Sequence, residues 1–283
     1  MDIIRAKAVM QQYALEQRAA GRQIGLVPTM GALHEGHLSL VRQARQDGDR
    51  VVVSVFVNPT QFAPGEDFDT YPRTFEADCG ACEELGVDVL FAPTAAEMYP
   101  VDAQTGVVQD RLGALLEGAS RPTHFRGVLT VVLKLFHLAV PHQAYFGQKD
   151  YQQTVVIRRM VRDLDVPVGV RVMPTVREPD GLAMSSRNRG LSPVERRQAG
   201  CLWRALAGCG ERFRLGERDP AVLTDAMSAE VRAEPDARLD YVRVVKPDTL
   251  EPAALVEPGD VVLFAVYVGE TRLIDNLILG EAS

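Results

Sequence analysis

Short apolar runs alternate with amphipathic stretches over the first two thirds of the chain. The run at 51–57 is rich in β-branched residues and almost continuous, which is typical of a strand buried on both faces. Similar patterns predict strands at 24–27, 87–91, 144–147 and 168–172, and helices starting near 37 and at 75–85, 124–140 and 151–164. Strands that alternate with helices of this length indicate right-handed βαβ units and a parallel sheet. We therefore predict a doubly wound, Rossmann-like α/β domain, in which ligands lie at the carboxyl ends of the strands.

The pattern changes after about residue 176. A turn signal, Glu178-Pro-Asp-Gly181, is followed by a capping box, Ser192-Pro-Val-Glu195, which predicts the start of a helix. Two helical stretches, at 193–213 and 219–233, precede apolar runs at 239–245, 261–268 and 273–279. Helices followed by neighbouring strands indicate a separate, smaller α+β domain. The predicted domains are therefore 1–176 and 177–283.

Composition and charge narrow the class of protein. The chain has 283 residues and a formal net charge of −7, with 46% hydrophobic and 24% charged residues, which is ordinary for a globular protein. The acidic excess argues against a nucleic-acid-binding protein, which would need a basic face. No segment has the ~18–20 continuous apolar residues of a membrane span, and the N-terminus lacks the pattern of a signal peptide. The four cysteines are too few and too dispersed for a disulfide framework, so we expect a cytoplasmic protein without a membrane partner.

The first candidate site follows the predicted strand at 24–27, where His34, Gly36 and His37 open a helix. The N–H groups and the dipole of a helix N-terminus favour phosphate, and two imidazoles can donate further hydrogen bonds to it. Two solvent-exposed histidines beside a turn are the ordinary explanation of such a pair, but the position after a buried strand favours phosphate binding. A zinc-protease motif is disfavoured, because it needs two histidines four residues apart on a formed helix.

Two further segments carry chemistry suited to phosphate. Lys149 is one of only four lysines among 31 basic residues, and it follows the predicted strand at 144–147. Its ammonium is a compact charge that suits phosphate, although a solvated lysine in a turn is the alternative. Ser185, Ser186 and Arg187 offer two hydroxyls and a guanidinium in a row. No Gly-x-x-x-x-Gly-Lys-Ser/Thr stretch occurs, so this is not a Walker-type loop.

These segments together resemble a known family. The His-x-Gly-His type sequence at His34 and the Met184-Ser-Ser-Arg187 loop are similar to the adenylate-forming nucleotidyltransferase superfamily. Longer motifs resemble the pantothenate synthetase (pantoate–β-alanine ligase) family over essentially the whole chain: Val27-Pro-Thr-Met-Gly-Ala-Leu-His-Glu-Gly-His37, Val57-Asn-Pro-Thr-Gln-Phe62, Tyr71-Pro-Arg-Thr74, Leu116-Glu-Gly-Ala-Ser-Arg-Pro-Thr-His-Phe-Arg-Gly127, Phe146-Gly-Gln-Lys-Asp-Tyr-Gln-Gln153, Asp180-Gly-Leu-Ala-Met-Ser-Ser-Arg-Asn188 and Arg272-Leu-Ile-Asp-Asn276.

The resemblance implies a reaction and a set of site residues. Members of the family condense pantoate with β-alanine, using ATP and Mg²⁺, through a pantoyl adenylate. The implied roles are proton donor for His37, phosphate-orienting partner for His34, and further catalytic groups for Lys149 and Arg187. Gln61 and Gln153 are implied to bind the pantoate or β-alanine substrate, and the chain is implied to form a homodimer with a small C-terminal lid domain. The nucleotide contacts implied are Met30, Gly31, Ala32, Leu33, His34, Glu35, Gly36, His37, Gly147, Gln148, Lys149, Asp150, Val176, Met184, Ser185, Ser186 and Arg187.

Some residues near these motifs keep more than one interpretation. Arg121 can pair with either a phosphate or the carboxylate of Glu117, and the sequence does not decide between these two partners. Mg²⁺ in such sites is held mostly by nucleotide phosphates and water, so Asp78 is considered only as an outer-shell acceptor. Cys79 and Cys82 match half of a zinc knuckle, but without a second pair they are better explained as two buried thiols on a helix.

Two other functions compete with the ligase. A nucleotidyltransferase of the same superfamily with a phosphorylated acceptor would need extra basic residues, where Gln61 and Gln153 are neutral. A nucleotide-binding regulatory protein without turnover would be expected to lose at least one of His34, His37 and Lys149, and all three are present. The ligase is therefore the leading hypothesis.

Overall fold

In the computed structural model, which describes residues 1–281, the chain divides into two units. The first unit consists of Met1–Gly147 and Gln153–Pro174, and the second consists of Gln148–Gln152 and the chain from Thr175 onwards. The short segment Gln148–Gln152 therefore groups with the second unit, although its chain neighbours on both sides belong to the first. Each unit is described separately.

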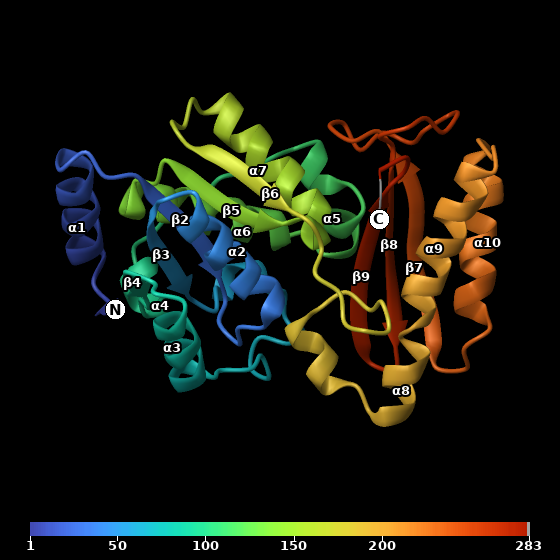
Figure 1. Ribbon diagram of the computed structural model, residues 1–283, viewed down its shortest axis with the longest axis horizontal. Helices are drawn as coiled ribbons and strands as arrows, with labels where there is room; N and C mark the ends of the chain where they lie inside the picture. The colour runs from blue at the N-terminus through green and yellow to red at the C-terminus, as the bar shows by residue number, and fades with distance from the viewer. Residues whose placement is uncertain (282–283) are drawn as a thin grey trace. The chain divides into compact units, whose positions relative to one another are not determined.

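The first unit contains a six-stranded parallel sheet in the order β1-β4-β3-β2-β5-β6, which confirms the predicted doubly wound, Rossmann-like fold (Figure 1). The chain order reverses between β2 and β5, where ligands lie in such folds. The strands are β1 (Asp2–Ile4), β2 (Ile24–Thr29), β3 (Arg50–Val55), β4 (Val89–Phe91), β5 (Gln143–Gly147) and β6 (Gly169–Met173). The helices are α1 (Lys7–Ala19), α2 (Glu35–Gln46), α3 (Phe75–Glu84), α4 (Ala95–Met98), α5 (Glu117–Ser120), α6 (His124–Ala139) and α7 (Tyr151–Asp163), with the 3₁₀ turns η1 (Pro59–Gln61) and η2 (Leu112–Ala114).

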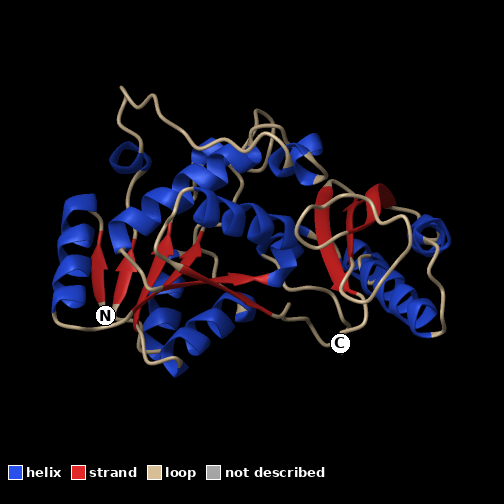
Figure 2. Cartoon of the chain, turned by 90° about the horizontal axis from the view of Figure 1, so that it is seen from above, coloured by secondary structure: helices blue, strands red, loops and turns tan. Residues whose placement is uncertain are grey.

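Helices cover both faces of this sheet, as Figure 2 shows, and the strand sequences explain why. Successive side chains of a strand point to opposite faces. In β2, Leu26 packs into the core formed with α1, α6 and α7, whereas Val27 packs into the core formed with α2 and α3. In β3, Val52 joins the first core and Val53 the second. Because both faces are buried, the strands are apolar throughout, and this is the pattern that the sequence shows at 51–57.

The second unit contains a three-stranded antiparallel sheet in the order β7-β8-β9, with helices α9 and α10 packed against one face. Its elements are the 3₁₀ turns η3 (Gln148–Asp150) and η4 (Ser186–Gly190), the helices α8 (Pro193–Gln198), α9 (Cys201–Arg214) and α10 (Pro220–Arg232), and the strands β7 (Ala237–Val245), β8 (Val261–Val268) and β9 (Thr271–Ile278). The single helical stretch predicted at 193–213 is wrong, because the chain turns at Ala199 and Gly200 and forms two helices. Glycine is a poor helix former, which explains the break there.

Candidate active site

The loop after β2 has a strained backbone that a buried carboxylate holds in place. Gly31 and Ala32 both have positive φ angles, +82° and +51°, a conformation that costs a residue with a Cβ atom. The N–H groups of Ala32 and Leu33 donate to the two carboxylate oxygens of Asp78, at 3.0 and 2.8 Å, and Thr74 Oγ1 donates to the same carboxylate at 3.2 Å. Asp78 is therefore a structural clamp on this loop. An outer-shell contact from Asp78 to Mg²⁺ stays a prediction, because a carboxylate has about four acceptor sites and the loop and Thr74 use three of them.

The two histidines after this loop cap helix α2 in a reciprocal arrangement. His34 is the N-cap residue, and its Nδ1 accepts from the N–H of Gly36 at 3.2 Å, while the N–H of His34 donates to Nδ1 of His37 at 3.4 Å. The two rings lie 4.1 Å apart between centroids. Because both Nδ1 atoms accept hydrogen bonds, each neutral ring carries its proton on Nε2. The three-residue spacing is that of an ordinary capping box, with imidazoles in place of Ser/Thr and Glu.

This arrangement changes how the segment can bind an anion. The sequence predicts that free backbone N–H groups at the start of the helix receive a phosphate. In the structure the N–H groups of Ala32, Leu33, His34 and Gly36 already donate to Asp78 or to an imidazole. The further N–H donors of this segment are therefore the imidazole Nε2–H groups of the two neutral rings.

Gln61 lies at the end of η1, after β3, and its side chain is held at both ends. Nδ2 of Asn58 donates to Oε1 of Gln61 at 3.1 Å, and Nε2 of Gln61 donates to Sδ of Met30 at 3.0 Å. The structure therefore brings together two of the predicted site residues, Met30 and Gln61. A thioether is a weak acceptor, so an oxygen ligand can replace it at little cost. Gly127 of α6 packs against the backbone of η1 so closely that an added Cβ would lie 2.5 Å from the Gln61 nitrogen.

A half-buried histidine to which the sequence assigned no role supports the backbone of Gln61. Nδ1 of His124 lies 3.0 Å from the Gln61 carbonyl oxygen, and Nε2 of His124 lies 3.3 Å from NH1 of Arg121. Because arginine only donates, Nε2 accepts and Nδ1 carries the proton that binds Gln61. Burial, and then the charge of Arg121, lower the pKa of His124 to about 4. The ring is therefore neutral at pH 7.

Arg121 pairs with a residue that was not among the expected partners. Its Nε and NH2 donate to the two carboxylate oxygens of Glu66, at 2.8 and 2.5 Å. Burial alone would raise the pKa of Glu66, but the hydrogen bonds and the charge of Arg121 hold it below the usual value. The carboxylate partner of Arg121 is thus Glu66 and not Glu117, which corrects that expectation, while a contact between Arg121 and phosphate stays a prediction.

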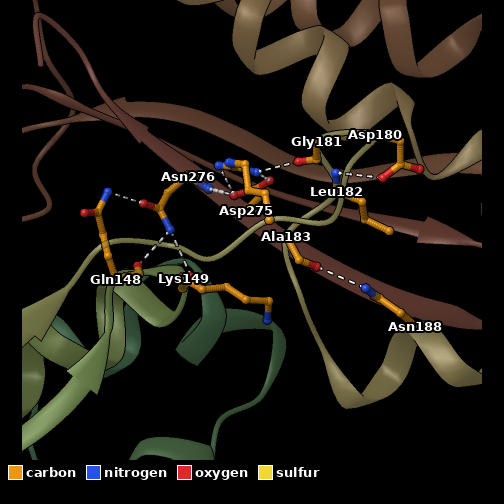
Figure 3. Close-up of polar contacts among 10 residues, drawn as sticks. Gln148, Lys149, Asp180, Gly181, Leu182, Ala183, Asn188, Asp275 and Asn276 are labelled. Carbon is orange, nitrogen blue, oxygen red and sulfur yellow. Dashed lines mark hydrogen bonds and ion pairs between the residues drawn. The ribbon is translucent and has the colours of Figure 1, made fainter. Parts of the chain in front are cut away.

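In the second unit, η3 begins directly after β5 and carries Lys149. Within residues 1–281, no carboxylate forms an ion pair with the Lys149 ammonium, and the side chain extends away from Asn276 (Figure 3). The backbone beneath it is fixed from β9, because Nδ2 of Asn276 donates to the carbonyl oxygens of Gln148 and Lys149, both at 2.9 Å. An ammonium left unpaired on a fixed backbone suits an anionic ligand.

The turn predicted at 178–181 belongs to a small hairpin that pairs two of the predicted nucleotide contacts. The N–H of Met184 donates to the Val176 carbonyl at 3.0 Å. Gly181 has a φ of +90°, and a Cβ there would lie 2.0 Å from Cδ1 of Trp203. The guanidinium carbon of Arg177 lies 4.3 Å from the centroid of the same indole ring, and NH1 of Arg177 donates to the Gly181 carbonyl at 3.0 Å. The hairpin is therefore fixed on both sides of its turn.

Ser185, Ser186 and Arg187 follow this hairpin and enter η4. Oγ of Ser185 caps the turn by accepting from the N–H of Arg187 at 3.3 Å, and Ser186 is buried. Nδ2 of Asn188 donates to the Ala183 carbonyl and to Glu178, at 3.1 and 2.9 Å. The predicted phosphate clamp is thus an ordered, capped turn whose two ends are tied to the hairpin.

Gln153 is half-buried on the first turn of α7, and its side chain makes no hydrogen bond within residues 1–281. Phe62 packs edge-on against Phe68, with ring centroids 5.4 Å apart. All four cysteines are free, and burial raises the pKa of Cys82 to about 12, as expected for an inert thiol.

Two features are absent from the described residues. None of the helices within residues 1–281 has both the length and the apolar character that a membrane span requires. The same part of the chain contains no group of three or more His, Cys, Asp and Glu side chains that could hold a metal ion.

The fold and these residues define a class of protein: a Rossmann-like α/β protein with a pair of histidines after β2 and a lysine after the neighbouring strand β5. Comparison with known proteins makes the assignment specific. The family model described as pantoate-beta-alanine ligase matches residues 2–278. The chain belongs to the pantoate–β-alanine ligase family.

Individual relatives agree over the full length. The chain is 52% identical to the pantothenate synthetase of Moorella thermoacetica, over 99% of both chains. Its fold matches the crystal structure of pantothenate synthetase from Thermus thermophilus with a TM-score of 0.92 and 49% identity, covering 98% of this chain and 99% of the other. A pantoate-beta-alanine ligase from Francisella tularensis, crystallised with beta-gamma ATP and beta-alanine, matches with a TM-score of 0.80 and 34% identity, covering 100% and 99% of the two chains.

Proposed function

We propose that this chain condenses pantoate with β-alanine at the expense of ATP. The observation that carries the proposal is the match to the ligase family over residues 2–278, in a chain that retains His34, His37, Lys149 and both candidate amides. In the first step a pantoate carboxylate oxygen bonds to the α-phosphorus of ATP and pyrophosphate leaves. In the second step the β-alanine amine bonds to the acyl carbon, AMP leaves, and the amine gives up a proton.

The residues suit a reaction that needs charge neutralisation more than proton abstraction. A carboxylate is already ionised at pH 7, so its attack requires no general base. We propose that the Nε2–H groups of His34 and His37 donate to phosphate oxygens, with His37 as the proton donor, and that Lys149 neutralises phosphate charge. The segments Met30–His37, Gly147–Asp150, and Met184–Arg187 with Val176 are proposed to contact the nucleotide.

The candidate pantoate residues are neutral amides. Gln61 can exchange its bond to Met30 Sδ for a bond to a pantoate oxygen, while Asn58 keeps the amide in the same orientation. Gln153 is proposed as the second amide, because its side chain makes no hydrogen bond within residues 1–281. Neutral donors can orient the carboxylate without opposing its attack with a full positive charge.

Mg²⁺ enters this proposal as part of the substrate Mg·ATP. Mg²⁺ bound in this way is coordinated mainly by phosphate oxygens and water. We also propose that the protein acts in the cytoplasm as a homodimer, as the family resemblance implies. Size-exclusion chromatography with light scattering tests the dimer, and a monomer at micromolar concentration would contradict it.

The exchange of labelled pyrophosphate into ATP tests the function. Exchange should require pantoate and should not require β-alanine, because the adenylate forms before the amine reacts. Exchange that ignores pantoate, or that needs a different acid, would overturn the proposal. The His37→Ala variant should slow exchange by ~100-fold or more, the scale of losing a general acid, with an unchanged circular dichroism spectrum. A wild-type rate in this variant would remove His37 from its assigned role.

A further inference from the structure

Two adjacent residues of β9, Asp275 and Asn276, each hold a different segment of the second unit. Both are almost completely buried, at 2% and 1% exposure. Buried polar side chains of this kind normally have all their hydrogen-bonding partners close by. Asn276 contacts the predicted nucleotide-binding segment at 147–150 (Figure 3), whereas Asp275 contacts Arg177, in the hairpin that precedes the segment at 184–187. The strand that carries both residues lies about 100 positions or more along the chain from these partners.

Asn276 fixes the backbone of the lysine segment. Its Nδ2 donates to the carbonyl oxygens of Gln148 and Lys149, both at 2.9 Å, and its Oδ1 accepts from Nε2 of Gln148 at 3.3 Å. Both N–H groups of the Asn276 side-chain amide therefore donate to consecutive backbone carbonyl groups. This contact links residues 127 and 128 positions apart in the sequence, and it determines where the Lys149 side chain begins.

Asp275 fixes the hairpin that leads into the serine segment. Its carboxylate accepts from NH1 and NH2 of Arg177, at 2.7 and 3.1 Å, and from the N–H of Asn276 at 2.8 Å. Arg177 in turn donates to the Gly181 carbonyl and lies over the ring of Trp203. The bonds run from Asp275 through Arg177 to the hairpin, and the hairpin continues directly into the phosphate-clamp residues at 185–187.

Asp275 and Asn276, the two anchor residues, are neighbours in the strand, so their Cα atoms lie ~3.8 Å apart. β9 pairs with β8 along its whole length, with Asp275 opposite Phe264 and Asn276 opposite Leu263. Because successive side chains of a strand point to opposite faces, Asp275 and Asn276 reach the two segments from opposite sides of the same rigid strand. The spacing between the two segments is therefore set by the strand rather than by either loop.

We infer that Asp275 and Asn276 are positioning residues that hold Lys149 and the 185–187 segment in the spacing needed to bind the nucleotide phosphates together. The inference rests on the proposed function of those two segments. It assigns a physical role to the Arg272-Leu-Ile-Asp-Asn276 motif, whose last two residues touch no substrate in this scheme and act through the backbone of other residues. A shift of ~1 Å in such a group lowers the rate of a positioned reaction on the order of 100-fold.

The decisive variant is Asn276→Asp, which keeps the shape of the side chain and removes both N–H donors. We expect the KM for ATP in pyrophosphate exchange to rise at least ~10-fold, and kcat to fall, with the KM for pantoate within ~2-fold of wild type. Amide hydrogen exchange at 148–150 should become faster in the same variant. Asn276→Ala should show the same split.

Asp240→Asn is the matched control. This substitution removes the ion pair between Asp240 of β7 and Arg272 of β9, which lie in the same sheet with Oδ2 and NH2 2.7 Å apart and are both half-buried. It should leave the KM for ATP unchanged. Asp275→Asn tests the other anchor, because the emission of Trp203, the single tryptophan, should change with its stacked guanidinium. The tryptophan readout requires no turnover.

The outcomes separate the inference from the proposed function. Wild-type KM for ATP and wild-type exchange protection at 148–150 in Asn276→Asp would overturn the inference while the ligase function stands. Loss of the folded circular dichroism spectrum in both Asn276 variants would also overturn it, in favour of a purely structural role. If the wild-type protein fails to show pantoate-dependent exchange, the proposed function fails, and the hydrogen exchange of 148–150 with and without ATP still decides the inference.

Discussion

The half-buried His124 leads to a quantitative prediction about stability and pH. Its ring is neutral at pH 7 because burial and Arg121 lower its pKa from 6.5 to about 4. In the unfolded chain the histidine regains an ordinary pKa near 6.5. Below that value the unfolded state binds a proton that the folded state does not, so stability falls as the pH falls from 6.5 towards 4. Above pH 6.5 the effect is absent.

The size of the effect follows from the two pKa values. Each pH unit between them costs about 1.4 kcal/mol, so lowering the pH from 7.5 to 5.0 should remove ~2 kcal/mol of unfolding free energy through His124 alone. The substitution His124→Asn removes the titration and keeps an N–H donor near the position of Nδ1, within reach of the Gln61 carbonyl. This variant should therefore lose ~2 kcal/mol less than the wild type over the same pH interval.

Urea unfolding at the two pH values measures the difference. Far-UV circular dichroism follows the whole chain, while the fluorescence of Trp203, in the second unit, marks transitions to which His124 does not belong. The variant should also keep the KM for pantoate within ~2-fold of wild type at pH 7.5, because the bond to Gln61 is retained. Equal losses of free energy in wild type and His124→Asn between pH 7.5 and 5.0 would refute the assigned protonation state.

Three further predictions concern other parts of the chain. Burial raises the pKa of Asp49, whose Oδ2 accepts a hydrogen bond from the Tyr145 hydroxyl at 2.7 Å. The folded state therefore favours the protonated carboxyl, and the unfolding free energy falls as the pH rises through the folded-state pKa. Asp49→Asn should raise Tm at pH 7 by ~2–4 °C in calorimetry, with a smaller gain at pH 4. Gly181→Ala should destabilise the second unit by ~2–3 kcal/mol through overpacking against Trp203, and adding Trp203→Ala should relieve much of that cost in urea unfolding. Lys149→Ala should raise the KM for ATP ~10-fold or more without lowering Tm, and an unchanged KM would argue against its phosphate role.

The fold could be predicted from the sequence because its signals are local. Both faces of the parallel sheet are buried, so Val51, Val52 and Val53 form an uninterrupted apolar run, and that run identifies the strand directly. Strand β1 was not predicted because it is only three residues long and two of the three are exposed, which leaves no periodic pattern. The break at Gly200 was missed because the apolar spacing continues across it.

The candidate site residues could be proposed from their type and their place in the sequence, but their contacts could not be predicted. His34, Lys149 and Ser185 were proposed because they follow strands or turns that the sequence predicts. The role of Asp78 was missed because a carboxylate on a helix gives no local sign that it binds the N–H groups of a loop 46 positions earlier. The same holds for Asn276, whose partners lie more than 120 positions away. Such contacts depend on how the elements pack, which no local pattern records.

The distribution of charge among these residues fits the proposed chemistry better than the net charge of −7 does. Around Gln61 the charged groups cancel, because Arg121 is committed to Glu66 and the low pKa of His124 keeps its ring neutral. A carboxylate that binds to the Gln61 amide therefore meets neutral donors and remains nucleophilic. The Lys149 ammonium, in contrast, has no ion-pair partner within the described chain. Neutral groups for the nucleophile and a full positive charge for the phosphates are the division that attack of one anion on another requires.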